Sequence, residues 1–259
     1  MSGIAIIGGT GFETLAGDLE ITRIDVGTCF GPIIVNRASR ASTEFYFLSR
    51  HGADHHIAPH SVPYQANIAA LVELGVSHVI GTNAVGSLSI DLEPGSFVLY
   101  DDFIDFTRNR PLTYWTGHPS KSKLVVHTDF SNPYCDAIRK ALLEWSAISG
   151  VNLVKSATYV CTDGPRFESP AEIRMFRAMG GDVVGMTGLP EAIFAREAGL
   201  HYAGIGIVSN LGAGLSDGPV DHEANNVEMI THAAILQTLL LHAVEAIILD
   251  VPCRCFPAH

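Results

Sequence analysis

The chain has 259 residues, of which 47% are hydrophobic, and a formal net charge of -11. This length and apolar content suffice for one large domain with a full core, so we expect a single domain over residues 1–259, with 250–259 as a tail. The acidic balance argues against nucleic-acid polymers and anionic membranes as partners, because proteins that bind them usually carry a basic patch. Any anion that the protein binds must be held by local groups.

The cysteines and the N-terminal region indicate the compartment. No basic run followed by a long apolar core occurs near the N-terminus, which predicts no secretory signal and a cytoplasmic location. The five cysteines are scattered and odd in number, which suits a reducing compartment. For the close pair Cys253 and Cys255, a redox or metal-binding role is an alternative. Because no second cysteine or histidine cluster stands nearby at ligand spacing, we interpret this segment as an ordinary tail.

The first predicted element is a buried strand that ends in glycines, within GIAIIGGTGF at 3–12. Such an ending leaves backbone N–H groups bare and lets an anion approach the chain closely, and Thr10 adds a hydroxyl at the same place. Runs of β-branched, aromatic and other apolar residues predict further strands at 21–26, 33–36, 44–48, 78–82, 97–100, 158–161, 182–185 and 202–208.

Helices are predicted between these strands. Apolar residues at helical spacing indicate helices at 62–74, 189–198 and 227–249. Asn132 and Pro133 resemble the N-cap and first position of a helix that ends at Gly150, and 169–172 form a capping box. The last helix carries too many polar residues for a membrane span, and the polar loop 107–123 is long enough to be a lid or an interface. Alternating strands and helices predict an α/β fold with a central, largely parallel sheet flanked by helices, in which ligands bind at the carboxyl ends of strands.

Polar side chains follow the predicted strands at these ends. Arg50 and His51 come directly after the strand 44–48, as Thr10 follows the first strand. Arginine presents a planar fork of donors that matches phosphate, and histidine adds a further N–H, so the three residues predict a phosphate cradle. The alternative is that Arg50 is a structural ion-pair partner.

Two other clusters are interpreted as structural. Gly52 and Pro59 interrupt any helix that would align the histidines at 51, 55, 56 and 60, so we expect no metal site there. The aspartates at 101, 102 and 105 could serve glycoside hydrolysis, but strand-end and turn chemistry is the preferred interpretation.

Seven motifs of the chain occur in the same order in a known family. They are GGTG at 8–11, SRHG at 49–52, PHSVPYQANIAAL at 59–71, TNAVGSL at 82–88, DDFIDFT at 101–107, DGPRFESPAE at 163–172 and GMTGLPEAIFAREAG at 185–199. Together they resemble the trimeric purine nucleoside phosphorylase and methylthioadenosine phosphorylase superfamily. The resemblance implies a homotrimeric pentosyltransferase of the nucleoside-phosphorylase fold, acting on a small purine nucleoside.

The resemblance also implies roles for individual residues. Phosphate would attack the anomeric carbon of the ribosyl unit as the purine leaves, a reaction that needs inorganic phosphate as co-substrate and neither a metal nor an organic cofactor. Met186 would lie against the ribose, and Phe167 would cover the sugar and base. The positions that match phosphate-binding residues are Thr10, Arg50, His51, Ala84 and Thr187.

Two positions predict which purine leaves. Methylthioadenosine phosphorylases look different here, with serine at the position of Glu168 and aspartates at those of Asn210 and Gly212, whereas this chain resembles 6-oxopurine nucleoside phosphorylases. An asparagine amide can accept from N7–H and donate to O6, and a carboxylate accepts from N1–H, which adenine lacks. We therefore expect a hypoxanthine-type base and catalytic roles for Asn210, Glu168 and His51.

The group at the 5' carbon is predicted from weaker signals. His55 and the segment 127–135 look closest to enzymes with a 5'-methylthio pocket, which His127 of a neighbouring subunit would line. This points to phosphorolysis of S-methyl-5'-thioinosine to hypoxanthine and 5-methylthioribose 1-phosphate. His222, however, lies in a segment that resembles the region binding a 5'-hydroxyl, so inosine, guanosine and then 5'-methylthioadenosine stay open as substrates.

Two other classes are alternatives. The glycines at 8, 9 and 11 resemble the start of a dinucleotide-binding turn, but Thr14 stands where the third glycine belongs and no Tyr-x-x-x-Lys occurs, so a nucleotide-dependent reductase or sensor is disfavoured. A nucleosidase that uses water would not need the cradle of Arg50 and His51.

Overall fold

The structure is a computed structural model. It describes residues 3–40, 43–119, 127–216, 218, 220, 222–247, 249 and 253–256, and of 222–231 the backbone alone. Among these residues we find no helix with the length and apolar character that crossing a membrane requires.

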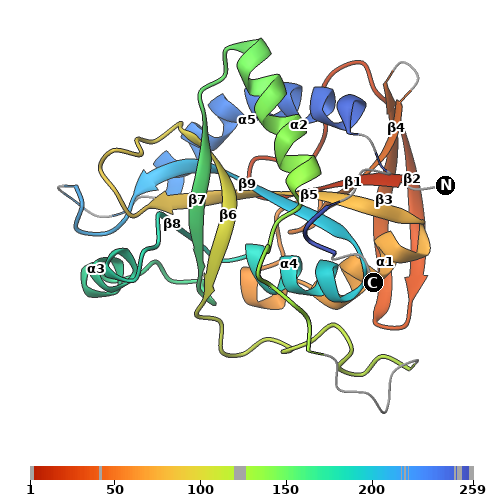
Figure 1. Ribbon diagram of the computed structural model, residues 1–259, viewed down its shortest axis with the longest axis horizontal. Coiled ribbons are helices and arrows are strands. Elements are labelled where there is room, and N and C mark those ends of the chain that lie inside the picture. The colour runs from red at the N-terminus through yellow and green to blue at the C-terminus, as the bar shows by residue number, and fades with distance from the viewer. Residues whose placement is uncertain are drawn as a thin grey trace.

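Nine strands in the described part of the chain form one mixed sheet, in the order β2-β3-β4-β1-β5-β8-β7-β6-β9 (Figure 1). Strand β5 also pairs with β9, so β5, β8, β7, β6 and β9 close into a ring beside the open part of the sheet. Pairings of β1 with β4 and β5 are parallel, whereas β5 with β8 and β6 with β9 are antiparallel. The strands are β1 (Gly3–Gly8), β2 (Glu20–Thr28), β3 (Gly31–Arg40), β4 (Thr43–Ser49), β5 (Val76–Ser87), β6 (Phe97–Asp105), β7 (Leu153–Cys161), β8 (Val183–Gly185) and β9 (His201–Leu211).

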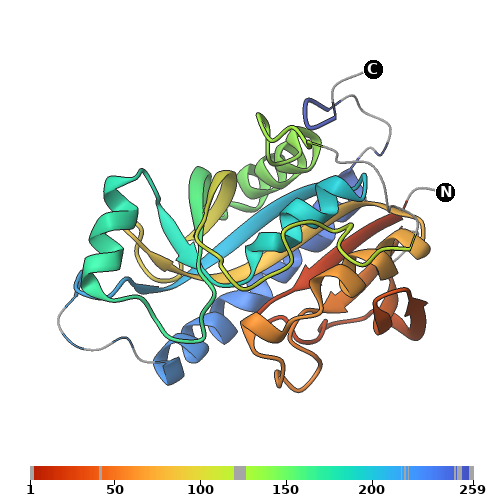
Figure 2. The ribbon, with the colours of Figure 1, turned by 90° about the horizontal axis from the view of Figure 1, so that it is seen from below.

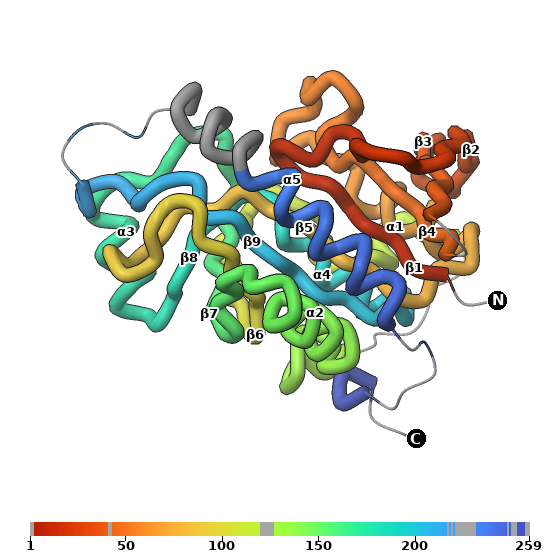
Figure 3. The backbone as a smooth tube through the Cα atoms, turned by 90° about the horizontal axis from the view of Figure 1, so that it is seen from above, coloured from red at the N-terminus to blue at the C-terminus, as the bar shows by residue number. Residues whose placement is uncertain are grey.

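Helices cover both faces of the sheet. The helices are α1 (Tyr64–Glu73), α2 (Asp136–Ser149), α3 (Pro170–Ala178), α4 (Gly188–Glu197) and α5 (His222–Ala246), with a short 3-10 turn η1 (Pro59–Ser61). Figure 2 shows α1 and α4 on one face, and Figure 3 shows α2 and α5 on the other. Strand β1 explains this arrangement, because Ile4 and Ile6 pack into the core under α2 and α5 while Ala5 and Ile7 pack into the core under α1 and α4.

The predicted start of the helix before Gly150 is wrong. Helix α2 begins at Asp136, after Cys135 with extended backbone angles, and not at Asn132 and Pro133. The carbonyl groups of Asn132 and Pro133 accept hydrogen bonds from the Arg196 guanidinium, and the Cys135 N–H donates to Tyr202 O at 2.8 Å. These long-range bonds hold the segment extended and delay the helix.

Two other helix boundaries are confirmed. Gly150 ends α2 in the left-handed conformation, at φ 72°. In the capping box of α3, the Ser169 N–H donates to Glu172 Oε2 at 2.8 Å, and the Glu172 N–H donates to Ser169 Oγ at 3.3 Å. This box fixes the loop just before α3, which carries Phe167 and Glu168.

Candidate active site

A pocket of about 490 Å³ opens where several strands end. It lies beside the ends of β1, β4, β8 and β9 and the last residues of β5, as expected for an α/β sheet. The predicted site residues that line it are Thr10, His51, His55, Ala84, Phe167, Glu168, Met186, Thr187 and Asn210. The fold thus brings together side chains that are up to 200 positions apart in the sequence, the distance from Thr10 to Asn210.

The glycines at the end of β1 are required because other atoms approach the backbone closely there. A Cβ atom on Gly8 would lie 2.1 Å from Phe12 O, and one on Gly9 would lie 2.5 Å from Thr82 O. The Gly9 N–H donates to Thr82 Oγ1 at 2.9 Å, which fastens the turn to β5. Thr10 is thereby presented at the wall of the pocket.

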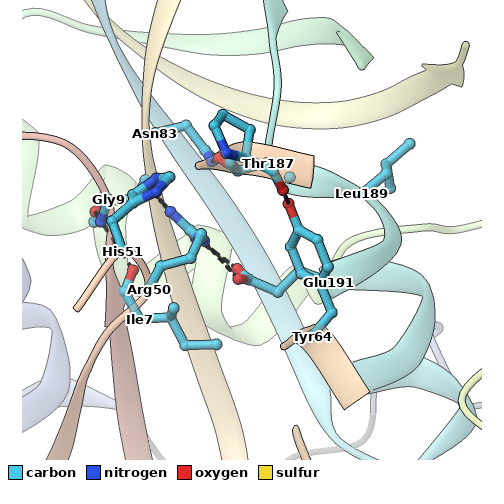
Figure 4. A network of polar contacts seen from close by, with 12 residues as sticks. Ile7, Gly9, Arg50, His51, Tyr64, Asn83, Thr187, Leu189 and Glu191 are labelled. Atoms are coloured by element: carbon cyan, nitrogen blue, oxygen red, sulfur yellow. Dashed lines mark hydrogen bonds and ion pairs between the residues drawn. The ribbon is translucent and has the colours of Figure 1, made fainter. Parts of the chain in front are cut away.

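Arg50 lies behind the pocket and is absent from its lining. Its Nε and Nη2 donate to the two carboxylate oxygens of Glu191, each at 2.6 Å, and Nη1 donates to Thr82 O at 2.7 Å (Figure 4). Both side chains are buried, with exposures of 0% and 1%. Burial alone would lower the pKa of Arg50, but the carboxylate of Glu191 raises it, so the guanidinium stays charged. These contacts are those of the structural ion pair that the sequence left as an alternative.

Arg50 nevertheless reaches the back of the glycine turn. A Cβ atom on Gly9 would lie 2.7 Å from Arg50 Nη1, so the guanidinium is in contact with the turn that presents Thr10. Its positive charge therefore lies directly beneath that turn.

His51 has a defined proton position. Its Nδ1 lies 2.7 Å from Ile57 O, and because a carbonyl oxygen only accepts, Nδ1 carries the proton. Burial and the neighbouring Arg50 guanidinium lower the pKa of His51 to about 4. The ring is therefore neutral near pH 7, and Nε2 holds a lone pair that can accept a hydrogen bond.

His55 stacks on His51 and also lines the pocket. The ring centroids are 4.8 Å apart, and His55 adopts a left-handed backbone conformation at φ 51°. His55 Nδ1 lies 2.6 Å from Glu13 Oε1. Burial opposes ionisation of Glu13, but hydrogen bonds from His55 and from backbone N–H groups lower the pKa of Glu13, so this carboxylate is charged.

Thr187 stands between β8 and α4 with its hydroxyl held by a buried amide. Asn83 Nδ2 donates to Thr187 Oγ1 at 2.9 Å, while the N–H groups of Thr187 and Gly188 donate to Tyr159 Oη at 3.2 and 3.0 Å. Because Oγ1 accepts from Asn83, its own proton remains available to a ligand oxygen. Thr10, His51, Ala84 and Thr187 therefore form one polar end of the pocket.

Glu168 lies in another part of the lining, on the loop before α3. Thr162 Oγ1 donates to Glu168 Oε1 at 2.8 Å. Burial raises the pKa of Glu168 above its ordinary value, an effect that the hydrogen bond from Thr162 partly offsets. Phe167 beside it is 39% exposed and lines the same pocket.

Asn210, near the end of β9, has an oriented amide. Ser209 Oγ donates to Asn210 Oδ1 at 2.8 Å, and Asn210 Nδ2 donates to Leu211 O at 2.8 Å. Strand pairing sets Asn210 opposite Gly86 of β5, so the absence of a side chain at Gly86 leaves the amide room. The amide of Asn210 therefore lines the pocket with both its oxygen and its nitrogen held in one orientation.

Two buried charged residues that support the site were not singled out from the sequence. Glu191 holds Arg50, and its Oε1 also accepts from Tyr202 Oη at 2.8 Å. Arg110 Nη2 donates to Met186 O at 2.6 Å and to Asp163 O at 3.1 Å, which joins the loop after β7 to the loop after β8. Both residues lie within or beside the quoted motifs, but only the folded chain reveals their partners.

Of the remaining two predicted residues, only His127 has a described side chain. His127 is exposed and is absent from the lining in its own chain. His222 begins α5, and its side chain lies outside the described residues.

The fold and the pocket define a class of protein: an α/β enzyme with one pocket at its strand ends, lined by hydroxyl, imidazole, carboxylate and amide side chains. Comparison with known proteins agrees. Residues 3–245 match the model of the phosphorylase superfamily. The chain therefore belongs to the phosphorylase superfamily, in its purine nucleoside phosphorylase family of pentosyltransferases.

The relatives of this chain are named for different substrates. The chain is 43% identical over 257 residues to a 6-oxopurine nucleoside phosphorylase from Pyrococcus furiosus, covering 98% of this chain and 97% of the relative. It is 49% identical over 216 residues to a probable S-methyl-5'-thioinosine phosphorylase from Methanothermobacter thermautotrophicus, covering 82% and 73%. A methylthioadenosine phosphorylase from Schistosoma mansoni, solved with adenine, superimposes with a TM-score of 0.89 at 32% identity, covering 95% and 92% of the two chains.

Proposed function

We propose that this enzyme cleaves 6-oxopurine nucleosides with phosphate, and that S-methyl-5'-thioinosine is the preferred substrate. The observation that carries the choice of base is the presence of Glu168 and Asn210 in one pocket, together with the polar end formed around Thr10 and Thr187. The products are then hypoxanthine and 5-methylthioribose 1-phosphate.

Phosphate is proposed to bind at the polar end. Thr10 and Thr187 offer hydroxyl donors, and neutral His51 accepts from a protonated phosphate oxygen through Nε2. Arg50 supplies positive charge from beneath the glycine turn, where its Nη1 would lie 2.7 Å from a Cβ atom added to Gly9. This arrangement holds the nucleophile against the anomeric carbon, which replaces a bimolecular encounter by a positioned one.

The base is proposed to leave against Asn210. The bond from the anomeric carbon to phosphate oxygen forms as the bond to N9 breaks, and the electron pair of the broken bond passes into the purine ring. The purine takes up a proton from solvent at N7, and hydrogen phosphate gives up its own proton as it becomes the ribosyl ester. Asn210 Oδ1 accepts from this N7–H, and Nδ2 donates to O6. Because Ser209 and Leu211 already orient the amide, little reorganisation is needed as charge develops.

Glu168 is proposed to select the 6-oxo form. Its carboxylate accepts from N1–H of hypoxanthine or guanine, whereas adenine presents a lone pair at N1. A site built to pair with a substrate proton rejects an analogue without it, since the buried carboxylate is left without that donor.

The preference at the 5' carbon rests on the wall next to His51. Ile57, Ala58 and Pro59 give this wall an apolar surface, and Val220 adds to the lining. A methylthio group gains from burial against such a surface, at about 0.8 kcal/mol for each buried CH2-sized unit. Inosine or guanosine phosphorolysis is the second candidate, because His55 and His56 of the same lining can pair with a 5'-hydroxyl.

The test is cleavage of S-methyl-5'-thioinosine, inosine and 5'-methylthioadenosine, each with and without phosphate. Phosphate-dependent cleavage with the highest kcat/KM for S-methyl-5'-thioinosine supports the whole proposal. Equal or faster cleavage of inosine overturns the 5' preference and leaves the base assignment standing. Cleavage of 5'-methylthioadenosine alone overturns the base assignment, and cleavage that ignores phosphate makes the enzyme a hydrolase.

A homotrimer with shared pockets is part of the proposal. His127, exposed and outside the lining in its own chain, is the residue that a neighbouring subunit would supply. The test mixes His127→Ala subunits with Asn210→Ala subunits, each weakly active alone. Recovery of activity on mixing supports a pocket that His127 of a neighbour completes, whereas full activity of His127→Ala alone removes this residue from the site.

A further inference from the structure

Four side chains gather at the opposite end of β9 from the pocket. Cys135 precedes α2, His201 begins β9, and Cys253 and Cys255 belong to the C-terminal segment, which lies beside the start of α2 (Figure 3). Their ligand atoms all lie within 4.8 Å of one another. The interpretation of Cys253 and Cys255 as an ordinary tail is therefore wrong in its premise. The fold supplies the missing cysteine and histidine from positions far along the chain.

The four ligand atoms are grouped about as closely as ligands around one small ion, and three of the pairs are somewhat closer. Cys135 Sγ lies 3.6 Å from His201 Nδ1 and 3.3 Å from Cys253 Sγ, and His201 Nδ1 lies 3.1 Å from Cys255 Sγ. A tetrahedral zinc site with three sulfur ligands and one nitrogen ligand has ligand atoms about 3.5–3.8 Å apart. The two tail sulfurs, 2.6 Å apart, need to separate by about 1 Å to reach this geometry.

The surroundings hold the four groups in place. The Cys255 N–H donates to Cys253 Sγ at 3.4 Å, a bond that stabilises a thiolate. Arg254, between the two tail cysteines, binds Asp136 through Nε at 2.7 Å and Nη2 at 3.1 Å, which anchors the tail to the first residue of α2. The His201 ring is stacked on His78, with centroids 4.4 Å apart, so Nδ1 keeps facing the sulfurs.

We propose that Cys135, His201, Cys253 and Cys255 bind one zinc ion as a closed structural site. Three thiolates and an imidazole are a ligand set that zinc prefers, whereas calcium and magnesium need oxygen ligands. Four protein ligands complete a tetrahedron, so no position is left for substrate. Binding displaces the protons of the three thiols to solvent, and it joins the C-terminal segment to α2 and β9.

The site is structural and not catalytic because of its position. Strand β9 runs from His201 at the cluster to Asn210 at the pocket. At about 3.3 Å per residue, the strand separates the two by about 30 Å. The zinc site therefore stands independently of the proposed function, and its loss acts on stability before it acts on chemistry.

The first experiment measures metal in the full-length enzyme. The untagged protein is purified under reducing conditions without chelator, and its zinc content is determined by elemental analysis. We expect about one zinc per chain, and replacement by cobalt(II) should give the visible absorption of tetrahedral cobalt thiolate. Removal of zinc by a chelator should lower the thermal midpoint by about 5–15 °C while leaving kcat at moderate temperature unchanged.

Matched variants separate ligation from packing. Cys253→Ser and His201→Phe should lose zinc, whereas His201→Cys, which keeps four ligands, should retain it. Cys29→Ser is the control, since Cys29 is an exposed free cysteine outside the cluster. Equal zinc content in His201→Phe and the wild type would overturn the assignment.

Two further results count against the proposal. One is a reduced, folded wild-type protein with less than about a tenth of a zinc per chain after incubation with zinc salt. The other is a disulfide between any two of the three sulfurs in freshly purified protein, detected by thiol titration and peptide mass. Either result would mean that this cluster is not a zinc site.

Discussion

Arg50 and Glu191 form a two-pronged ion pair beneath the pocket, with Arg50 Nε and Nη2 each 2.6 Å from a carboxylate oxygen. The pair joins the loop after β4 to α4, and Tyr202 of β9 completes the partners of Glu191. A buried pair of this kind is costly to break, because the remaining charge has no compensation. Variants of either residue therefore separate the structural role of Arg50 from a role in phosphate binding.

Removal of one partner should destabilise the enzyme more than removal of both. We expect Glu191→Ala to lower the free energy of unfolding by about 3–5 kcal/mol, and Arg50→Met with Glu191→Leu to recover part of this loss. Urea denaturation measures both. If Arg50 also attracts phosphate, KM for phosphate in the double variant rises at least about 10-fold. An unchanged KM would mean that Arg50 serves only in the structural ion pair and not in phosphate binding.

Glu168→Gln should weaken discrimination between bases. Glutamine can donate as well as accept, so the ratio of kcat/KM for inosine to that for adenosine should fall about 10- to 100-fold. Glu172→Gln is the matched control, since glutamine also serves in a capping box. A ratio that falls equally in both variants would assign the effect to the loop before α3 and not to the carboxylate.

The same carboxylate predicts a pH dependence. Burial raises the pKa of Glu168, so its charged form is lost at a higher pH than for an ordinary glutamate. As pH falls through that value, kcat/KM for 6-oxopurine nucleosides should decline, and Glu168→Gln should remove this limb of the profile. An acid limb that persists unchanged in the variant contradicts the assignment.

His51 should make the free enzyme less stable in acid. Its pKa is about 4 in the folded chain because of burial and Arg50, and its ordinary value is 6.5. Between these pH values His51 is protonated in the unfolded chain and neutral in the folded chain. The free energy of unfolding therefore falls as pH falls from 6.5 to 4, by about 3 kcal/mol. We expect His51→Gln to lose this part of the slope and the exposed His60→Gln to keep it, as measured by denaturation without phosphate.

Gly9→Ala should damage the phosphate end through sterics alone. The new Cβ atom would lie 2.5 Å from Thr82 O and 2.7 Å from Arg50 Nη1, so the turn must shift, at a cost of about 1–3 kcal/mol, and KM for phosphate should rise. Gly27→Ala is the control, because nothing lies within 4 Å of its added atom. Normal phosphate binding by Gly9→Ala would show that the turn does not form the cradle.

The sequence predicted the local features of this fold better than the long-range ones. Periodicity and capping located the strands and the box of α3, because these depend on neighbouring residues. The start of α2 was misplaced because Arg196, more than 60 positions away, binds the carbonyl groups that a helix would use. Of the residues predicted to bind phosphate and base, the structure brings Thr10, His51, Glu168 and Asn210 to one pocket, where their roles stay predictions, while Arg50 lies outside the lining. The cluster of Cys135 and His201 with the tail lay beyond sequence spacing, because 66 positions separate Cys135 from His201 and 54 separate His201 from Cys255.

Strand β5 contributes Ala84, Val85 and Gly86 to the lining and connects two parts of the site. Thr82 holds the glycine turn, Ala84 two residues on belongs to the polar end, and Gly86 is paired with Asn210. Four residues of extended chain span about 13 Å. One strand therefore sets the distance between the glycine turn and Asn210, the proposed positions of phosphate and base. Changes in the loops around the pocket leave this distance unchanged, so a ligand must have a length that fits it.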